Sequence, residues 1–346
     1  MATTSARDRA VDLVKTFAIV GVLLIHVSAG GFVGQVKSAG WLAALFWGSV
    51  SRASVPLFFM CTGALLLRPE REYPPRRILT RNLPRILAAL FFWAACYGAY
   101  HLWAGSDFSS AAILNALKSL VLFRHESHLY YLHITILIYL CVPLLRVFTS
   151  SADEKQLRYA LVIWVLTAIV YPTVRPLWPF RLLGGIPAQW ALNMTWGSMG
   201  YCLLGHYLRT YPPEKRALGP ALWAVGLCMV FGGTLAASER TGTLRTQYLE
   251  GMSIGVAVMA CGIFASLSRL TLKERAARVC GTVSGASFCV YLVHMFFVYL
   301  LRRFGLSGAL APSAVTIPAV VALVFAGSFV VWLVLRRIPV VNRWLI

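Results

Sequence analysis

The first hydrophobic stretch, residues 10–32, constrains the fold most, because it is as long as a membrane helix yet contains ionisable side chains. Lys15 and His26 are eleven residues apart, so on a helix they share one face about 16 Å apart along the axis. Asp12 lies close to that face. Ionisable groups inside hydrocarbon usually face a bundle interior or a water-filled cavity. His26, deep in the stretch, therefore indicates a functional path, whereas Asp12 and Lys15 are equally compatible with side chains that reach the membrane surface.

The composition extends this interpretation to the whole chain. Of its 346 residues, 59% are hydrophobic and only 13% are charged, against about 25% charged in a soluble domain. We predict an all-α, polytopic membrane helix bundle of about ten transmembrane helices that forms a single domain over residues 1–346. The expected spans lie near residues 10–32, 41–67, 82–104, 129–148, 158–177, 190–209, 218–238, 247–268, 281–301 and 313–335.

The basic residues, which give a net charge of +20, lie mostly beside the apolar segments. With a cytoplasmic N-terminus, 21 Lys and Arg residues fall in inside loops and flanks and nine in outside loops, which favours cytoplasmic N- and C-termini. The positive charge therefore indicates membrane topology, with lipid headgroups as partners. It does not indicate nucleic acid, since the chain has no nucleic-acid-binding motif and no long soluble domain to carry one.

The cysteines and histidines give little support for a metal site. The eight cysteines lie in or beside apolar segments and form no CxxC pair, so we expect small buried hydrophobic side chains. His125 and His128 have an HxxH spacing in the outside loop 105–128. Because no further ligand set is close in sequence, we expect a solvated loop there and no metal ion.

Arg52 lies inside the second predicted span, at a depth near that of His26. A buried guanidinium needs a carboxylate, a carbonyl, water or a ligand phosphate. Pro56 is expected to kink the same helix, because it lacks a backbone donor. We interpret Arg52 as a candidate catalytic residue. The alternative is a structural role in which it donates hydrogen bonds to backbone carbonyls.

Two further groups of residues are candidates for binding. Arg81 and Arg85 are four apart at the start of the third span, where two guanidiniums make a good site for phosphates; ordinary positive-inside charge is the alternative. His294 lies near the middle of the ninth span, and Tyr291 lies almost one turn earlier. For His294, substrate contact and helix packing remain equally compatible with the sequence.

Taken together, these motifs resemble the membrane-bound acyltransferase 3 family. The resemblance covers nearly the whole chain and is closest to bacterial surface-glycan O-acetyltransferases of the enterobacterial common antigen type. It rests on five parts of the sequence in this order: Asp12-Leu13-Val14-Lys15 with His26, residues 51–63, Arg81 with Arg85, residues 129–147 and residues 285–294.

The chain departs from the family pattern at two points. The basic residue ten intervening positions before the histidine is usually arginine, and here Lys15 keeps the charge but loses the bidentate fork. The paired arginines after the second span are usually spaced RxxR. Here the nearest pairs, Arg77 with Arg81 and Arg81 with Arg85, are spaced RxxxR, which leaves the assignment of that motif open.

The resemblance implies acyl transfer, usually of acetyl from cytoplasmic acetyl-CoA, to a hydroxyl of a cell-surface polysaccharide or lipid-linked glycan. It implies a bacterial inner-membrane enzyme that uses acetyl-CoA as co-substrate and needs no other cofactor. The catalytic residues would be His26 as base with Lys15 and Arg52, the donor-binding residues Arg77, Arg81 and Arg85, and the acceptor-binding residues Asp12, Tyr291 and His294. Direct transfer and an acetyl-histidine intermediate both remain open. The alternative is a non-enzymatic transporter or export component for lipid-linked glycans, which would also need basic residues in the membrane.

Overall fold

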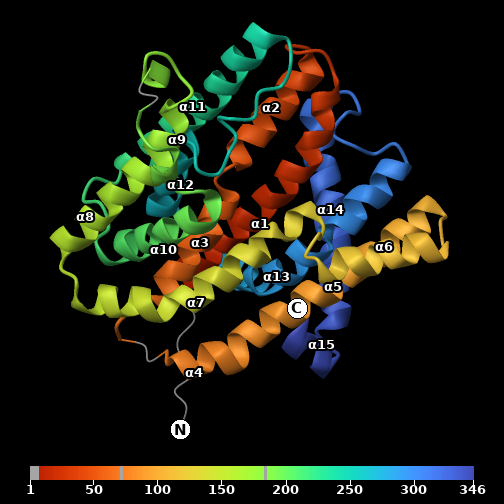
Figure 1. Cartoon of the computed structure of the whole chain (residues 1–346), viewed down its shortest axis with the longest axis horizontal. Coiled ribbons are helices and arrows are strands. Elements are labelled where there is room, and N and C mark those ends of the chain that lie inside the picture. Colours follow the sequence, from red (N-terminus) through yellow and green to blue (C-terminus); the bar gives the residue numbers. More distant parts are fainter. Residues whose placement is uncertain (1–7, 71–72, 183–184) are drawn as a thin grey trace.

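The computed structural model describes residues 8–70, 73–182 and 185–346, and every regular element within these ranges is helical (Figure 1). The predicted helical membrane bundle is therefore confirmed. Its main helices are α1 (Arg9–Ala29), α2 (Ala39–Ser51), α3 (Ser54–Leu66), α5 (Leu83–Gly105), α7 (Tyr130–Ser151), α8 (Glu154–Trp164), α10 (Met194–Thr210), α11 (Leu218–Thr241), α12 (Ile254–Leu267), α13 (Glu274–Arg303) and α14 (Ser313–Leu335). Shorter helices are α4 (Pro75–Arg77), α6 (Ser110–Val121), α9 (Tyr171–Val174) and α15 (Pro339–Trp344).

Eight helical stretches among the described residues are long and apolar enough to cross a membrane. They are Arg9–Val33, Ala39–Leu66, Pro75–Gly105, Ser127–Ser151, Glu154–Val174, Leu218–Thr241, Glu274–Arg303 and Ser313–Leu335. The other two predicted spans contain α10, with 17 residues, and α12, with 14, which are shorter than the roughly 20 residues of a straight membrane helix. Helix α12 begins late because Ser253 caps it, accepting a hydrogen bond from the Val256 N–H.

The second predicted span is broken at Arg52, between α2 and α3. Pro56 has no N–H, so the Arg52 carbonyl loses the donor that a continuous helix would offer it. Two serine hydroxyls at the break donate hydrogen bonds to other main-chain carbonyls there. Ser51 donates to the Gly48 carbonyl, and Ser54 donates to the Ser51 carbonyl at 2.6 Å. Hydroxyls of this kind satisfy backbone groups that a broken membrane helix leaves free.

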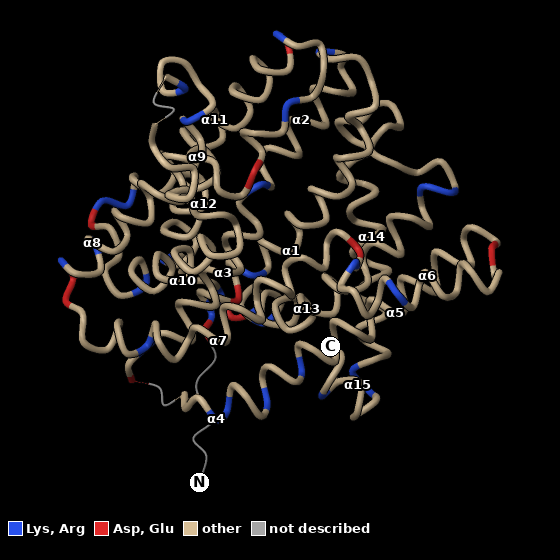
Figure 2. The backbone as a smooth tube through the Cα atoms, in the orientation of Figure 1, with Lys and Arg blue, Asp and Glu red and all other residues tan. Residues whose placement is uncertain are grey.

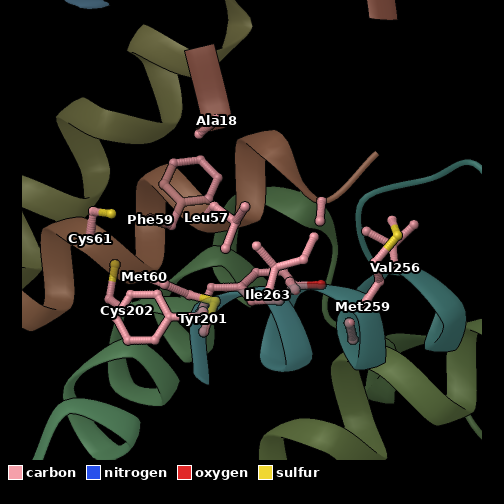
Figure 3. Packing of buried hydrophobic residues seen from close by; sticks show 14 of the residues in the cluster. Ala18, Leu57, Phe59, Met60, Cys61, Tyr201, Cys202, Val256, Met259 and Ile263 are labelled. Atoms are coloured by element: carbon pink, nitrogen blue, oxygen red, sulfur yellow. The ribbon is translucent and has the colours of Figure 1, made fainter. Parts of the chain in front are cut away.

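Small residues let α3 pack closely against α10. A side chain on Gly63 would collide with the Cys202 backbone, and one on Gly205 would collide with the Met60 backbone. Small residues at such crossings are typical of helix pairs in membranes, where close van der Waals packing drives association. Figure 3 shows this contact, with Met60 and Cys61 of α3 close to Cys202 of α10. This packing fixes α3 beside α1, which carries the ionisable residues.

Polar contacts at the helix ends define two faces of the bundle. Asp8, before α1, pairs with Arg68, after α3, and with Arg209, in the last turn of α10. Arg85, at the start of α5, donates to the main-chain carbonyl of Ile346, after α15. The start of α1 and the end of the chain therefore lie on one face (Figure 1), which we call the N-terminal face.

On the opposite face, ends of other helices meet. Lys37, before α2, pairs with Glu239, near the end of α11. Arg303, at the end of α13, donates to the Ala104 carbonyl near the end of α5. Helices that run in opposite directions thus alternate across the bundle, as the ten-span prediction requires.

The Asp8 carboxylate forms ion pairs with two arginines on the N-terminal face, and its side chain is only 6% exposed. Burial would raise its pKa, but hydrogen bonds from the Arg68 side chain and the Val11 N–H, together with the charge of Arg209, lower the pKa below its usual value. Because the folded state holds the ionised form more strongly than the unfolded state, this carboxylate stabilises the fold above its unfolded pKa of about 3.9. That contribution is lost as the pH falls through the folded pKa.

We expect Asp8→Asn to lower the free energy of unfolding by about 2 kcal/mol near neutral pH, because it removes charge-assisted hydrogen bonds to two arginines. Thermal unfolding in detergent, followed from about pH 7 down to about pH 3, checks this. The difference from wild type should narrow as the pH falls. The matched control is Arg9→Gln, which breaks the exposed pair between Arg9 and Glu274 and should cost less than about 0.5 kcal/mol. Equal decreases in the free energy of unfolding for Asp8→Asn and Arg9→Gln would contradict this role of Asp8.

Candidate active site

One cavity of about 600 Å³ lies inside the bundle, and most of its lining comes from α1, α3, α5, α7 and α13. Its lining includes five of the residues that the sequence predicted for the site: Lys15, His26, Arg52, Arg85 and Tyr291. The helical periodicity that placed Lys15 and His26 on one face therefore also places them on one cavity. A cavity is the environment in which ionisable side chains are tolerated at membrane depth.

The lining of the cavity reaches from one face of the bundle toward the other. Lys15 and Arg85 lie near the N-terminal face, in the second turn of α1 and the first turn of α5. Tyr130, in the first turn of α7, and Glu250, in the segment before α12, lie toward the opposite face. That segment is not helical at this depth. Irregular backbone within a membrane is tolerated where it lines a cavity, which explains why α12 is short.

His26 packs against two other histidines. Its ring centroid lies 4.9 Å from that of His294, on α13, and 6.2 Å from that of His128. The centroids of His128 and His294 are 5.2 Å apart. The Tyr291 hydroxyl donates to the His128 carbonyl at 2.5 Å and so joins α13 to the turn that carries His128. Three imidazoles therefore meet at the cavity wall: His26 and His128 line the cavity, and His294 lies behind them.

The prediction that the HxxH loop is solvated is wrong for His128, whose side chain is only 3% exposed. The 3₁₀ turn η3 (Ser127–Leu129) leads into α7 and turns His128 inward, onto the ring of Tyr97. His125 stays near the surface and contacts the Leu120 carbonyl. The burial of His128 could not be predicted, because it depends on how η3 packs against α5 and α13.

Arg52 and Glu250 bring opposite charges to the same cavity. Glu250 interacts electrostatically with Arg52, but no carboxylate among the described residues forms an ion pair with this guanidinium. The Arg52 Nε atom is buried and has no hydrogen-bond partner in the described part of the chain. Buried donors are rarely left unpaired unless a ligand or water completes them. Arg52 and Glu250 both line the cavity, and Glu250 is a site residue that sequence reasoning missed.

A second hollow, of about 560 Å³, adjoins the first on the N-terminal face and shares Asn82 and Arg85 with it. Arg81 and, from α15, Arg343 and Trp344 complete its cationic and aromatic lining. Figure 2 shows the basic residues along the segment from α4 to α5 and on α15. Among the described residues, no carboxylate side chain lines this hollow, so it suits an anionic ligand.

The backbone before α5 gives the two predicted arginines, Arg81 and Arg85, different positions. Arg81 belongs to a π-helical turn, Ile78–Asn82, because Pro84 cannot donate and the Leu83 N–H bonds to the Ile78 carbonyl instead. Arg81 is exposed and faces only the second hollow, whereas Arg85 reaches both. Arg85 also lies over the Phe288 ring.

Three other predicted residues lie away from the cavity lining. Asp12 is buried on α1. Arg77 is exposed on α4, with its guanidinium over the Tyr73 ring. His294 is fully buried behind His26. Within the described ranges, no group of three or more His, Cys, Asp or Glu side chains is arranged to hold a metal ion.

A family model described as an acyltransferase domain, of the acyltransferase 3 type, matches residues 8–337. The chain belongs to this acyltransferase family. No curated protein and no solved structure matches the chain significantly. The matched range includes every residue that lines the central cavity. Arg343 and Trp344 of the second hollow lie just after it.

Proposed function

We propose that this acyltransferase transfers acetyl from acetyl-CoA, bound at the N-terminal face, to a hydroxyl of a surface polysaccharide or lipid-linked glycan. The observation that carries the proposal is that the lining of one cavity includes both Arg85, beside a cationic hollow, and the half-buried His26. A donor with a phosphate-rich head and a long, slender arm matches this shape. The distance of about 16 Å between the levels of Lys15 and His26 is comparable to an extended pantetheine arm.

The second hollow supports coenzyme A as the donor. Arg81, Arg85 and Arg343 can pair with the phosphates of the nucleotide, and Trp344 offers a ring on which its base can stack. Lys15 would meet the arm where it enters the cavity. In this arrangement the N-terminal face is cytoplasmic, which agrees with the excess of basic residues expected inside.

His26 supplies the base that the reaction needs. Imidazole titrates near neutral pH, so it can take the proton of the acceptor hydroxyl as that oxygen attacks the thioester carbon. A C–O bond forms, the C–S bond breaks, and the proton passes to the leaving thiolate. Arg52, which lines the cavity, would stabilise negative charge on the carbonyl oxygen.

The opposite end of the cavity would hold the acceptor. Tyr130 and Glu250 line it there, and an aromatic ring with a carboxylate is a common combination for sugar hydroxyls. The enzyme would then act at the bacterial inner membrane, as a single domain of the surface-glycan O-acetyltransferase kind, on glycans presented outside. Tyr291, which lines the cavity between its ends, would contact either substrate.

We expect His26→Ala to lower acetyl transfer by about 10²-fold or more while acetyl-CoA affinity changes little, because a base acts on the reaction and hardly on ground-state binding. The assay uses purified protein, radiolabelled acetyl-CoA and glycans from a deletion strain as acceptor. A His26→Ala variant with wild-type transfer at matched expression would show that His26 is only a packed histidine. Wild-type protein that neither consumes nor binds acetyl-CoA would favour the transporter alternative.

We expect Arg81→Ala and Arg85→Ala each to weaken acetyl-CoA binding by about 1–3 kcal/mol, the usual contribution of charge-assisted hydrogen bonds. Isothermal titration calorimetry at two salt concentrations measures this. The affinity of wild type should fall more with salt than that of the double variant, because phosphate contacts are screened. The control is Arg76→Ala, an exposed arginine of α4 outside the hollow, which should change affinity little. Unchanged affinity in the double variant would place the donor elsewhere.

A further inference from the structure

His294 lies where it can act on His26 but not on a substrate. Its side chain has no exposed surface, and it does not line the cavity. His26 lines the cavity, and the two ring centroids are 4.9 Å apart. His26 therefore contacts both His294 and the cavity, which His294 itself does not reach. The sequence alone is compatible with either substrate contact or helix packing for His294. Neither role by itself explains a fully buried ring that contacts a cavity-lining histidine.

The backbone of α13 fixes which nitrogen of His294 carries hydrogen. Its Nδ1 atom lies 2.6 Å from the Tyr291 carbonyl oxygen. A carbonyl only accepts, so Nδ1 must donate, and in the neutral ring Nε2 then carries a lone pair. This Nε2 is buried and has no hydrogen-bond partner among the described residues. A buried acceptor held in one tautomer and left unpaired is unusual and indicates a partner that completes it during function.

The spacing of the rings fits a bond between His26 and His294. Two imidazoles joined by an in-line N–H···N bond of about 2.9 Å have centroids roughly 5 Å apart. The observed 4.9 Å matches this value. Catalytic hydrogen bonds are often poorly aligned in the absence of substrate and tighten when it binds.

His128 is a less suitable partner for His26. Its ring centroid is farther away, at 6.2 Å. Both of its ring nitrogens lack hydrogen-bond partners in the described part of the chain, so no carbonyl fixes its tautomer. Of the two histidines beside His26, His294 is therefore the one whose tautomer a main-chain carbonyl fixes, which leaves its Nε2 as the acceptor.

We propose that His294 is a positioning residue that accepts the N–H of His26, so that the other nitrogen of His26 presents its lone pair to the acceptor hydroxyl. This rests on the proposed function, in which His26 is the base. His26 takes the proton of the hydroxyl as the C–O bond forms, and returns it to the thiolate as the C–S bond breaks. His294 keeps its single proton throughout and stabilises the transient imidazolium, the part that a carboxylate plays in a Ser-His-Asp triad.

The test compares His294→Phe, which keeps the ring shape but removes the lone pair, with His294→Gln, whose amide can still accept and donate. We expect His294→Phe to lower kcat by about 10²-fold or more with acetyl-CoA affinity within about twofold, and His294→Gln to recover at least about tenfold of that loss. The assay is transfer from radiolabelled acetyl-CoA to glycans of the deletion strain, with binding measured by calorimetry. His125→Phe, which changes a histidine outside the cavity lining, is the control and should keep wild-type kcat.

The double variant with His26→Ala separates positioning from structural support. If His294 acts only through His26, adding His294→Phe to His26→Ala lowers the residual rate no further. An additive loss, a wild-type kcat in His294→Phe, or equal loss in His294→Gln and His294→Phe would overturn the inference. Each of these leaves the proposed function standing as long as wild type transfers acetyl and His26→Ala does not. Wild-type transfer in His26→Ala would instead overturn both.

Discussion

The structure depends on how a helix bundle accommodates ionisable side chains where lipid offers no hydrogen bonds. In this chain four of them line one cavity. Lys15 and His26 from α1, Arg52 from the break before α3, and Arg85 from α5 all line it. Elsewhere the helices are free to present apolar residues outward, as α1 does with Val20. The requirement to keep ionisable side chains away from lipid thus determines which faces of the helices pack together.

Irregular backbone serves the same requirement. The break at Arg52, the π-helical turn Ile78–Asn82 and the non-helical segment before α12 all carry residues that line the cavity or the adjoining hollow. Each irregularity has a local cause, namely Pro56, Pro84 or the Ser253 cap. Irregular backbone at membrane depth and π-helical turns both occur preferentially at cavities and functional sites. The proline and serine positions therefore shape the site as much as the charged residues do.

The sequence could predict the parts of the site that depend on a single helix. Lys15 and His26 share a face because of the helical repeat, and Arg52 is conspicuous inside an apolar stretch. It could not predict His128 or Glu250, because each reaches the cavity through a segment whose position depends on packing between distant helices. The predicted span 247–268 began too early, because residues 247–253 form a non-helical segment and α12 starts only after the Ser253 cap.

The central claim is that the acyl group is transferred at His26, within the cavity. The most direct measurement is a structure of the protein with a non-hydrolysable acetyl-CoA analogue bound. The account predicts the nucleotide beside Arg81, Arg85 and Arg343, and the carbonyl carbon of the acetyl group about 3–4 Å from where a hydroxyl bonded to His26 would lie. An analogue bound with its acetyl group outside the cavity that contains His26 would contradict the account.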